Sequence, residues 1–169
     1  MKKILSLSMS MLMLFAVATG CSSSKKPAEK TPEELTELYV TAITDAREAD
    51  FNEAFPIITN TAEDAQYLFP VLGFETADTS SAAVSISMMM VHAYGIAAIR
   101  PAEGKEETVL NGLQAFIDTQ KMNFEMYLAD QYDIACAAKL ETLEDGTILM
   151  VMCEGQDEVF ESIKAAILA

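Results

Sequence analysis

The sequence predicts an α+β domain: a two-layer fold whose four-stranded, mostly antiparallel sheet comes from two strand–strand–helix units, with additional N-terminal helices. Apolar runs of strand length occur in two pairs, and each pair precedes a segment with helical spacing of its apolar residues. The strand runs are residues 83–91, 96–100, 132–140 and 147–153, and the helical segments are 105–128 and 156–168. A shift of 51 residues aligns the halves, placing Gly95 on Gly146. We therefore expect the helices to cover one face of the sheet.

Residues 1–20 have the pattern of an export leader. A basic start, Lys2-Lys3, precedes a short apolar run, and small residues precede Cys21. A spanning helix needs about 20 apolar residues, so the run is too short to cross a membrane. The segment Val17-Ala18-Thr19-Gly20-Cys21 resembles the lipobox of bacterial lipoproteins, with Ala18 where leucine is usual. The resemblance implies a diacylglyceryl group on Cys21, with acyl chains such as palmitate, and cleavage before it; the alternative is an ordinary secretory leader.

The leader divides the chain into three parts. Residues 1–20 are the signal peptide, residues 21–30 are a flexible tether that begins with the lipidated Cys21, and residues 31–169 form a single domain. Two or three acyl chains anchor a protein stably, because each buried methylene contributes about 0.8 kcal/mol. We therefore expect a protein on the cell membrane, held by lipid and facing outside the cytoplasm.

The charge of the chain is strongly negative. It has 26 acidic and 11 basic residues, and loss of Lys2 and Lys3 with the leader takes the formal charge from −15 to −17. Nucleic acids and anionic lipid headgroups need clustered cations to displace their counterions, so they are poor partners for this domain. The charge is otherwise typical of a soluble acidic surface.

The N-terminal part of the domain reads as helical. Thr31 can cap a helix, Pro32 suits its first position and Glu34 completes a capping box, which predicts a helix to about residue 50. An irregular apolar connection follows over residues 51–58, and a second short helix begins near Thr61.

The two strand–strand–helix units follow with their own turn and start signals. Residues 92–95 form the first turn, and Asp145-Gly146 between two apolar runs predicts the second hairpin. The acidic pairs Glu106-Glu107 and Asp157-Glu158 each follow a glycine and complement a positive helix N-terminus. Adjacent helical residues diverge by about 100°, so these pairs mark helix starts rather than acid–base chemistry.

The order of these landmarks resembles one family. The runs SMMMVHAYGIAAIRPAEGKEETVLNGLQAFI and MYLADQYDIACAAKLETLEDGTILMVMCEGQDEVFESIKAAI are similar to the domain of unknown function 4358 family, over about residues 61–168. Its members are small lipoproteins, mostly of Gram-positive gut bacteria. They often carry an acidic residue near the first turn, where this chain has His92-Ala93-Tyr94. The family has no established activity, so the resemblance implies location and fold and transfers no site.

The residues give no catalytic, cofactor-binding or metal-binding set. His92 is the only histidine, and no nucleophile-elbow motif such as G-x-S-x-G accompanies it. Zinc would need ligand spacing that Cys136 and Cys153 lack. Thioethers suit monovalent copper, so Met88 and Met90 with His92 leave soft-metal handling open, but adaptable core filling is the better interpretation of these methionines.

The two cysteines of the domain fall on the two arms of the second predicted hairpin. A four-residue loop, 143–146, would place Cys136 directly opposite Cys153, whereas a two-residue loop would place them diagonally. Export permits a disulfide bond between them, so the sequence leaves this bond open.

Taken together, these features predict a noncatalytic binding or interaction module on the outer face of the membrane, with an envelope protein or peptide as partner. An envelope enzyme with a carboxylate-based site that leaves no motif is the alternative, and metal handling is a third. An exposed apolar patch would favour the binding module.

Overall fold

The computed structural model describes residues 30–169, so the leader and the predicted lipid attachment at Cys21 lie outside the described residues. The domain is an α+β fold around a five-stranded antiparallel sheet with the order β1-β2-β3-β5-β4. The strands are β1 (Ile58–Thr59), β2 (Thr79–Ile86), β3 (Gly95–Pro101), β4 (Lys139–Thr142) and β5 (Ile148–Met152). The prediction of four strands is wrong, because Ile58, at the end of the segment expected to be irregular, pairs together with Thr59 to Val84 and Ala83 of β2.

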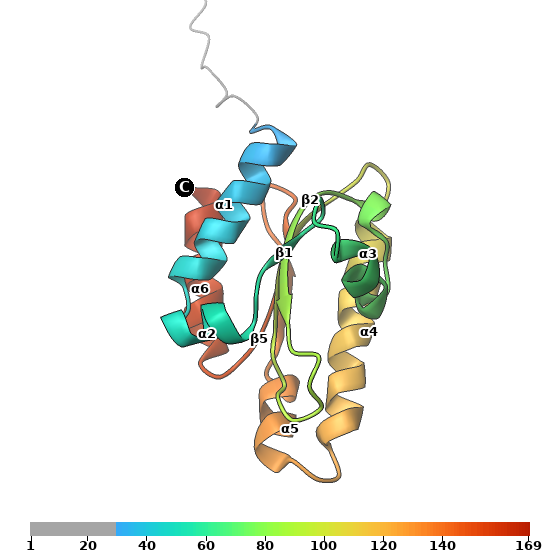
Figure 1. Cartoon of the computed structure of the whole chain (residues 1–169), viewed down its shortest axis with the longest axis vertical. Helices are drawn as coiled ribbons and strands as arrows, with labels where there is room; N and C mark the ends of the chain where they lie inside the picture. The colour runs from blue at the N-terminus through green and yellow to red at the C-terminus, as the bar shows by residue number, and fades with distance from the viewer. Residues whose placement is uncertain (1–29) are drawn as a thin grey trace, which may run out of the picture.

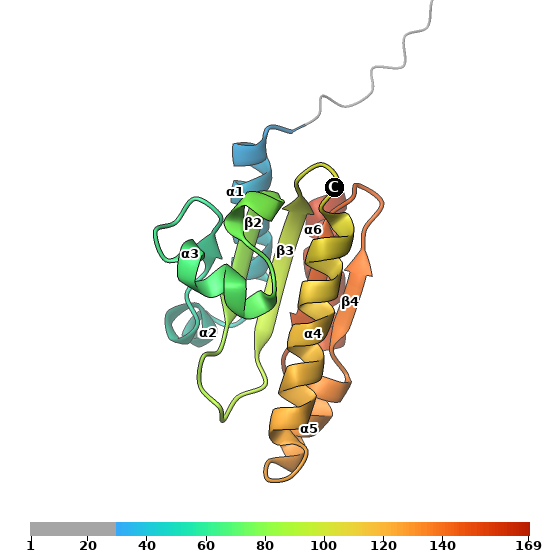
Figure 2. The ribbon, with the colours of Figure 1, turned by 90° about the vertical axis from the view of Figure 1, so that its right-hand side faces the viewer.

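Helices cover both faces of this sheet, as Figures 1 and 2 show. One face carries α1 (Pro32–Asp45), α2 (Ala49–Ala54) and α6 (Gln156–Leu168). The other carries α3 (Ala65–Leu68), the 3-10 helix η1 (Phe69–Leu72), α4 (Glu106–Phe124) and α5 (Ala129–Cys136). A second 3-10 helix, η2 (Thr76–Asp78), leads into β2. The predicted two-layer arrangement with one covered face is therefore wrong.

The central strands explain why both faces need a cover. Ala97 and Ile99 of β3 lie in the core under α4, whereas Ile96 and Ala98 lie in the core under α1 and α6. Both kinds of position are fully buried, as they are along β5. Successive strand residues point to opposite faces, so an unbroken apolar run indicates a strand buried on both sides.

Two predicted strand segments have a different structure. Residues 132–136 belong to α5 instead of a strand, and only Lys139–Thr142 pairs with β5. Tyr132 and Ala135 pack on the core under α4 with the spacing of a helix turn. At the first hairpin β2 ends at Ile86, and residues 88–91 form an exposed loop. The backbone leaves the strand where the Ser87 hydroxyl accepts a bond from the Met89 N–H at 3.1 Å.

The local start and turn signals are confirmed. Thr31 Oγ1 accepts from the Glu34 N–H at 3.2 Å, and Glu34 Oε2 accepts from the Thr31 N–H at 2.7 Å. The helix that begins there ends at Asp45, and α2 starts separately at Ala49. Gly146 closes the β4–β5 turn with a φ of 88°, a conformation that favours glycine. The strand–strand–helix layout also occurs twice, although α4 and α6 lie on opposite faces.

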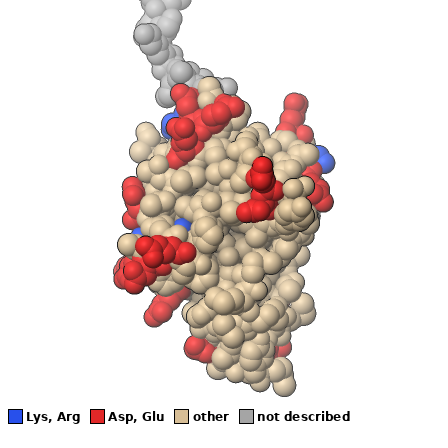
Figure 3. Space-filling view, in the orientation of Figure 1, with Lys and Arg blue, Asp and Glu red and all other residues tan. Residues whose placement is uncertain are grey.

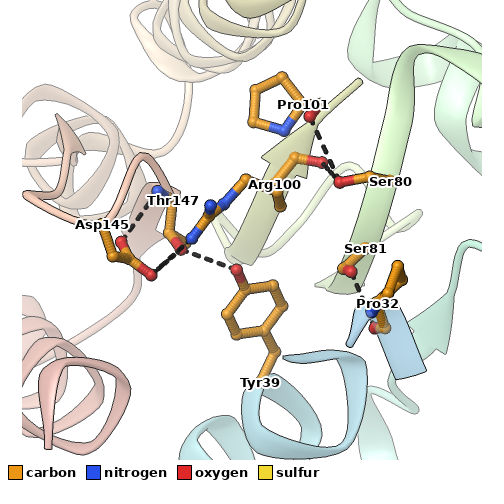
Figure 4. A network of polar contacts seen from close by, with 8 residues as sticks. All are labelled: Pro32, Tyr39, Ser80, Ser81, Arg100, Pro101, Asp145 and Thr147. Carbon is orange, nitrogen blue, oxygen red and sulfur yellow. Dashed lines mark hydrogen bonds and ion pairs between the residues drawn. The ribbon is translucent and has the colours of Figure 1, made fainter. Parts of the chain in front are cut away.

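A buried polar network fixes α1 to the sheet (Figure 4). The Tyr39 hydroxyl lies 2.7 Å from Thr147 Oγ1, which also donates to Asp145 Oδ2 at 2.8 Å. Arg100 Nη2 forms an ion pair with the same carboxylate oxygen at 2.8 Å. Burial raises the pKa of Tyr39, so the hydroxyl stays neutral. The network therefore determines where the middle of α1 lies over the sheet.

Candidate functional site

The described residues enclose two notable hollows, one on each face of the sheet. The first, here called the neutral groove, has a volume of about 310 Å³ and lies between η1, the β2–β3 loop and α4. Its lining residues are 70–73, 87–90, Gly112, Ala115, Phe116, Thr119, Gln120 and Asn123. None of them is charged, although 22% of the chain is charged.

Two glycines set the depth of the neutral groove. Gly73 has a φ of 84° and ends η1 directly against Gly112 of α4. A Cβ on Gly112 would collide with the Leu72 carbonyl oxygen and lie 2.9 Å from Phe74 Cδ1. The two backbones therefore touch at this point.

An exposed apolar surface adjoins the groove at the end of the molecule opposite residue 30. We call it the methionine tip; its residues are Met88, Met89, Met90, Val91, Met122, Met126 and Tyr127. Every one of these side chains is more than half exposed, and Met126 reaches 87%. The Tyr127 hydroxyl donates to the Met90 carbonyl at 2.9 Å and ties the β2–β3 loop to the end of α4. On the face that Figure 3 shows, this end of the molecule carries few charges.

The second hollow, here called the charged pocket, has a volume of about 560 Å³ and lies between the α1–α2 turn, the ends of β3 and β5, and the start of α6. Its charged lining residues are Asp45, Arg47, Glu48, Glu154 and Glu158. Phe51 and Tyr94 form an aromatic wall, with ring centroids 5.8 Å apart, and the Phe55 ring stacks on Tyr94 at 4.3 Å and lies 6.1 Å from the Phe51 ring.

Arg47 connects the elements around the charged pocket. Nε donates to Asn52 Oδ1 at 2.7 Å, and Nη1 donates to Ser85 Oγ at 2.7 Å and to the Tyr94 hydroxyl at 2.6 Å. Nη2 donates to the Phe55 carbonyl at 3.0 Å. All four acceptors are neutral, so the guanidinium is held in place without an ion pair from them.

The Cys153 thiol and the Tyr94 hydroxyl of this pocket are not poised for covalent chemistry. Burial raises the pKa of the Cys153 thiol to about 11, although the nearby Arg47 opposes the shift. Burial also raises the pKa of the Tyr94 hydroxyl, and its bond from Arg47 opposes that shift too. The thiolate is the reactive form of cysteine, so Cys153 is an unreactive lining residue at neutral pH.

The structure separates the residues that the sequence singled out. Cys136 is exposed on α5, Cys153 is buried after β5, and both thiols are free. The hairpin pairing that would place them opposite each other is absent, because β4 begins only at Lys139. His92 is exposed beside Phe55, with ring centroids 6.2 Å apart, and Met88 and Met90 are exposed rather than core residues.

Residues 30–169 lack a metal-binding cluster and a membrane-spanning helix. These residues contain no group of three or more His, Cys, Asp or Glu side chains that could hold a metal ion. None of the helices over the same range has the length and hydropathy needed to cross a membrane.

The sequence reasoning missed both Arg47 and the neutral groove. Arg47 is the only lysine or arginine between Lys30 and Arg100, which was an available signal. The groove had no signal of this kind, because it combines neutral residues from three separate segments.

Comparison with known families decides the affiliation. A family model described as Domain of unknown function (DUF4358) matches residues 53–153, more than half of the chain. The chain belongs to this family. No curated protein and no solved structure matches it.

The matched DUF4358 region contains one hollow and only part of the other. Every residue that lines the neutral groove lies within residues 53–153. Among the residues that line the charged pocket, only Tyr94, Ile96 and Cys153 lie within this range. The rest of that pocket comes from the α1–α2 region and from α6, which flank the DUF4358 match.

Proposed function

We propose that this chain is a lipid-anchored lipoprotein outside the cytoplasm, and that its DUF4358 domain is a noncatalytic module that binds a partner through the neutral groove and the methionine tip. The observation that carries the proposal is the methionine tip: seven large apolar side chains, each more than half exposed, on a chain of formal charge −15. Contiguous exposed apolar surface of this kind marks interaction sites in soluble domains.

Methionine suits such a surface physically. Its unbranched side chain and polarizable sulfur adapt to different apolar shapes, and methionine-rich surfaces serve proteins that bind varied partners. The neutral groove beside the tip gives a partner's apolar side chain a place to enter. The Tyr127–Met90 bond holds the two sides of the tip together, so less conformational entropy is lost on binding.

The partner that fits is an amphipathic segment of an envelope protein or peptide, with apolar anchors and basic flanks. The end of α4 and α5 carry Asp118, Glu125, Asp130 and Asp133, against a single lysine, Lys121, which already pairs with Asp118 at 3.4 Å. Complementary charge accelerates encounter and selects partners, while the apolar contact supplies affinity.

The position of the tip suits a tethered protein. Residue 30 and the start of α1 lie at the opposite end of the molecule from the tip (Figure 1). A lipid on Cys21 would hold that end near the membrane and leave the tip facing outward.

Two synthetic peptides test the binding proposal directly. They share one leucine face and carry either lysines or glutamates on the other face. We expect the full-length protein in detergent to bind the lysine peptide about tenfold or more tightly than the glutamate peptide, measured by fluorescence anisotropy. The Met88→Ser/Met90→Ser variant should lose this binding, while the Glu144→Gln/Glu161→Gln control on the other side of the molecule should keep it. Equal binding of both peptides, or binding that survives loss of the methionines, would refute the proposal.

The anchor is tested separately by cell fractionation. Cys21→Ala should release the protein from the membrane or leave an uncleaved precursor. Unchanged membrane retention of processed protein would contradict the lipid anchor and leave the binding proposal standing.

A further inference from the structure

The charged pocket has features that the proposed binding module does not use. We propose that it binds a small zwitterion, an amino acid or a short peptide, with the ligand carboxylate on Arg47 and the ligand ammonium on Glu154 and Glu158. This site shares no residue with the neutral groove or the methionine tip, so it stands or falls independently of them.

Arg47 keeps one donor free for a ligand. A guanidinium has five N–H donors, and four are engaged by the neutral acceptors described above. One Nη2 donor remains, and no carboxylate of residues 30–169 lies within 4 Å of the group. The side chain is half-buried, and burying a cation without an anion is costly. A ligand carboxylate would supply the missing counter-charge to a group that is already held in place.

The wall of the pocket across from Arg47 is negatively charged. Glu154 and Glu158 line the same hollow as Arg47, and within the described part of the chain neither takes part in an ion pair. Asp45 and Glu48 complete the acidic rim. A simple anion such as phosphate would meet these carboxylates and be repelled. A zwitterion satisfies both charge signs at once, because its ammonium can face the rim while its carboxylate reaches Arg47.

The space between these charges is large enough for a small ligand and has an aromatic wall. Phe51 is 39% exposed and stacks on Tyr94, which gives an apolar wall for a ligand side chain. A volume of about 560 Å³ falls in the range of sites for small molecules. Because burial holds the Cys153 thiol in its neutral form, the pocket is suited to binding rather than to reaction.

Titration calorimetry with four probes tests the proposal on the full-length protein in detergent. L-phenylalanine carries both charges, L-phenylalaninamide lacks the carboxylate, and N-acetyl-L-phenylalanine lacks the ammonium. We expect phenylalanine to bind, and each analogue to bind about tenfold or more weakly. The dipeptide Ala-Phe identifies the source: tighter binding than phenylalanine indicates a peptide ligand, and weaker binding indicates an amino acid. Absence of phenylalanine and dipeptide binding at millimolar concentration, or equal binding of the two single-charge analogues and phenylalanine, would overturn the proposal.

Paired variants locate the binding site. Glu154→Gln/Glu158→Gln should weaken the binding of phenylalanine about tenfold and leave the binding of N-acetyl-phenylalanine unchanged, because only the ammonium contact is lost. Glu103→Gln/Glu144→Gln removes the same charge at exposed sites away from the pocket and should change neither. Arg47→Lys should weaken the binding of phenylalanine and leave the binding of phenylalaninamide unchanged. If Arg47→Lys does not fold, the Glu154→Gln/Glu158→Gln variant still tests the site, because its two side chains are exposed and their replacement should not disturb folding. Unchanged phenylalanine binding in the glutamate pair would overturn the assignment.

Discussion

The neutral groove and the charged pocket lie on opposite faces of one sheet and differ in almost every property. The groove has no charged lining residue and opens beside exposed methionines, whereas the pocket has five charged lining residues around an aromatic wall. The groove is built entirely from residues within the DUF4358 match, and the pocket depends on the flanking helices α1 and α6.

This difference separates two kinds of recognition. Apolar, adaptable surface without fixed charges gives affinity for a macromolecular segment but little selectivity for small polar molecules. Charges of both signs at fixed positions select a small ligand by its charge pattern. We therefore expect the groove to be a feature shared across DUF4358 domains, and the pocket to occur where helices like α1 and α6 cover the second face.

The largest expected effect comes from closing the contact under the groove. Gly112→Ala places a Cβ against the Leu72 carbonyl oxygen and Phe74, so η1 must move away from α4. Overpacking of this kind should cost about 2 kcal/mol of unfolding free energy in urea titration. The neighbouring exposed control, Asn111→Ala, should be near neutral. Peptide binding at the groove should fall and amino-acid binding at the pocket should not; equal loss at both sites would mean that the two hollows are coupled.

A smaller effect should follow from loosening α1 on the other face. Tyr39→Phe removes the buried 2.7 Å bond to Thr147, while Thr147 keeps its bond to Asp145. We expect a loss of about 1 kcal/mol in unfolding free energy, typical of one hydrogen bond. Tyr67→Phe, at a tyrosine that is 73% exposed, is the matched control. Amino-acid binding at the charged pocket should weaken in Tyr39→Phe, because α1 leads directly into the turn that holds Arg47. Peptide binding at the neutral groove should stay unchanged.

Changes confined to the methionine tip should barely affect stability. Met88→Ser/Met90→Ser alters side chains that are 65% and 58% exposed. The unfolding free energy should change by less than about 0.5 kcal/mol, even though the lysine peptide no longer binds. A larger loss of stability would show that these methionines belong to the core, as the sequence predicted.

The smallest effect concerns acid stability at a site remote from both hollows. The Glu75 N–H at 2.8 Å and the Lys105 ammonium at 2.9 Å hold the pKa of the Asp78 carboxyl below its usual value. This group therefore stabilises the fold above the ordinary carboxyl pKa of about 4, and its contribution is lost as the pH falls further. Asp78→Asn should lower Tm at pH 7 and show a shallower fall of Tm below pH 4 than the parent protein. Parallel Tm curves would contradict the role of Asp78.

Local signals predicted the parts of the fold that depend on a few adjacent residues. The Thr31–Glu34 capping box, the Asp145-Gly146 turn and the two acidic helix starts are all present. The errors arose where a segment's partner decides its state. Residues 132–136 are apolar enough for a strand, but they pack as α5 against α4, and residues 88–91 leave the sheet because nothing covers them. Neither hollow was predicted, since each combines residues from three or more separate segments.

The amino-acid sequence by itself determined the family, the helix starts and turns, and the double strand–strand–helix layout, because each rests on short-range pattern. Only the tertiary structure decided that α4 and α6 cover opposite faces, that Met88, Met89 and Met90 stay in solvent and that Arg47 lines a pocket. These outcomes depend on which surfaces meet after the chain has folded, and hydrophobic burial, which brings those surfaces together, has no preferred direction along the chain.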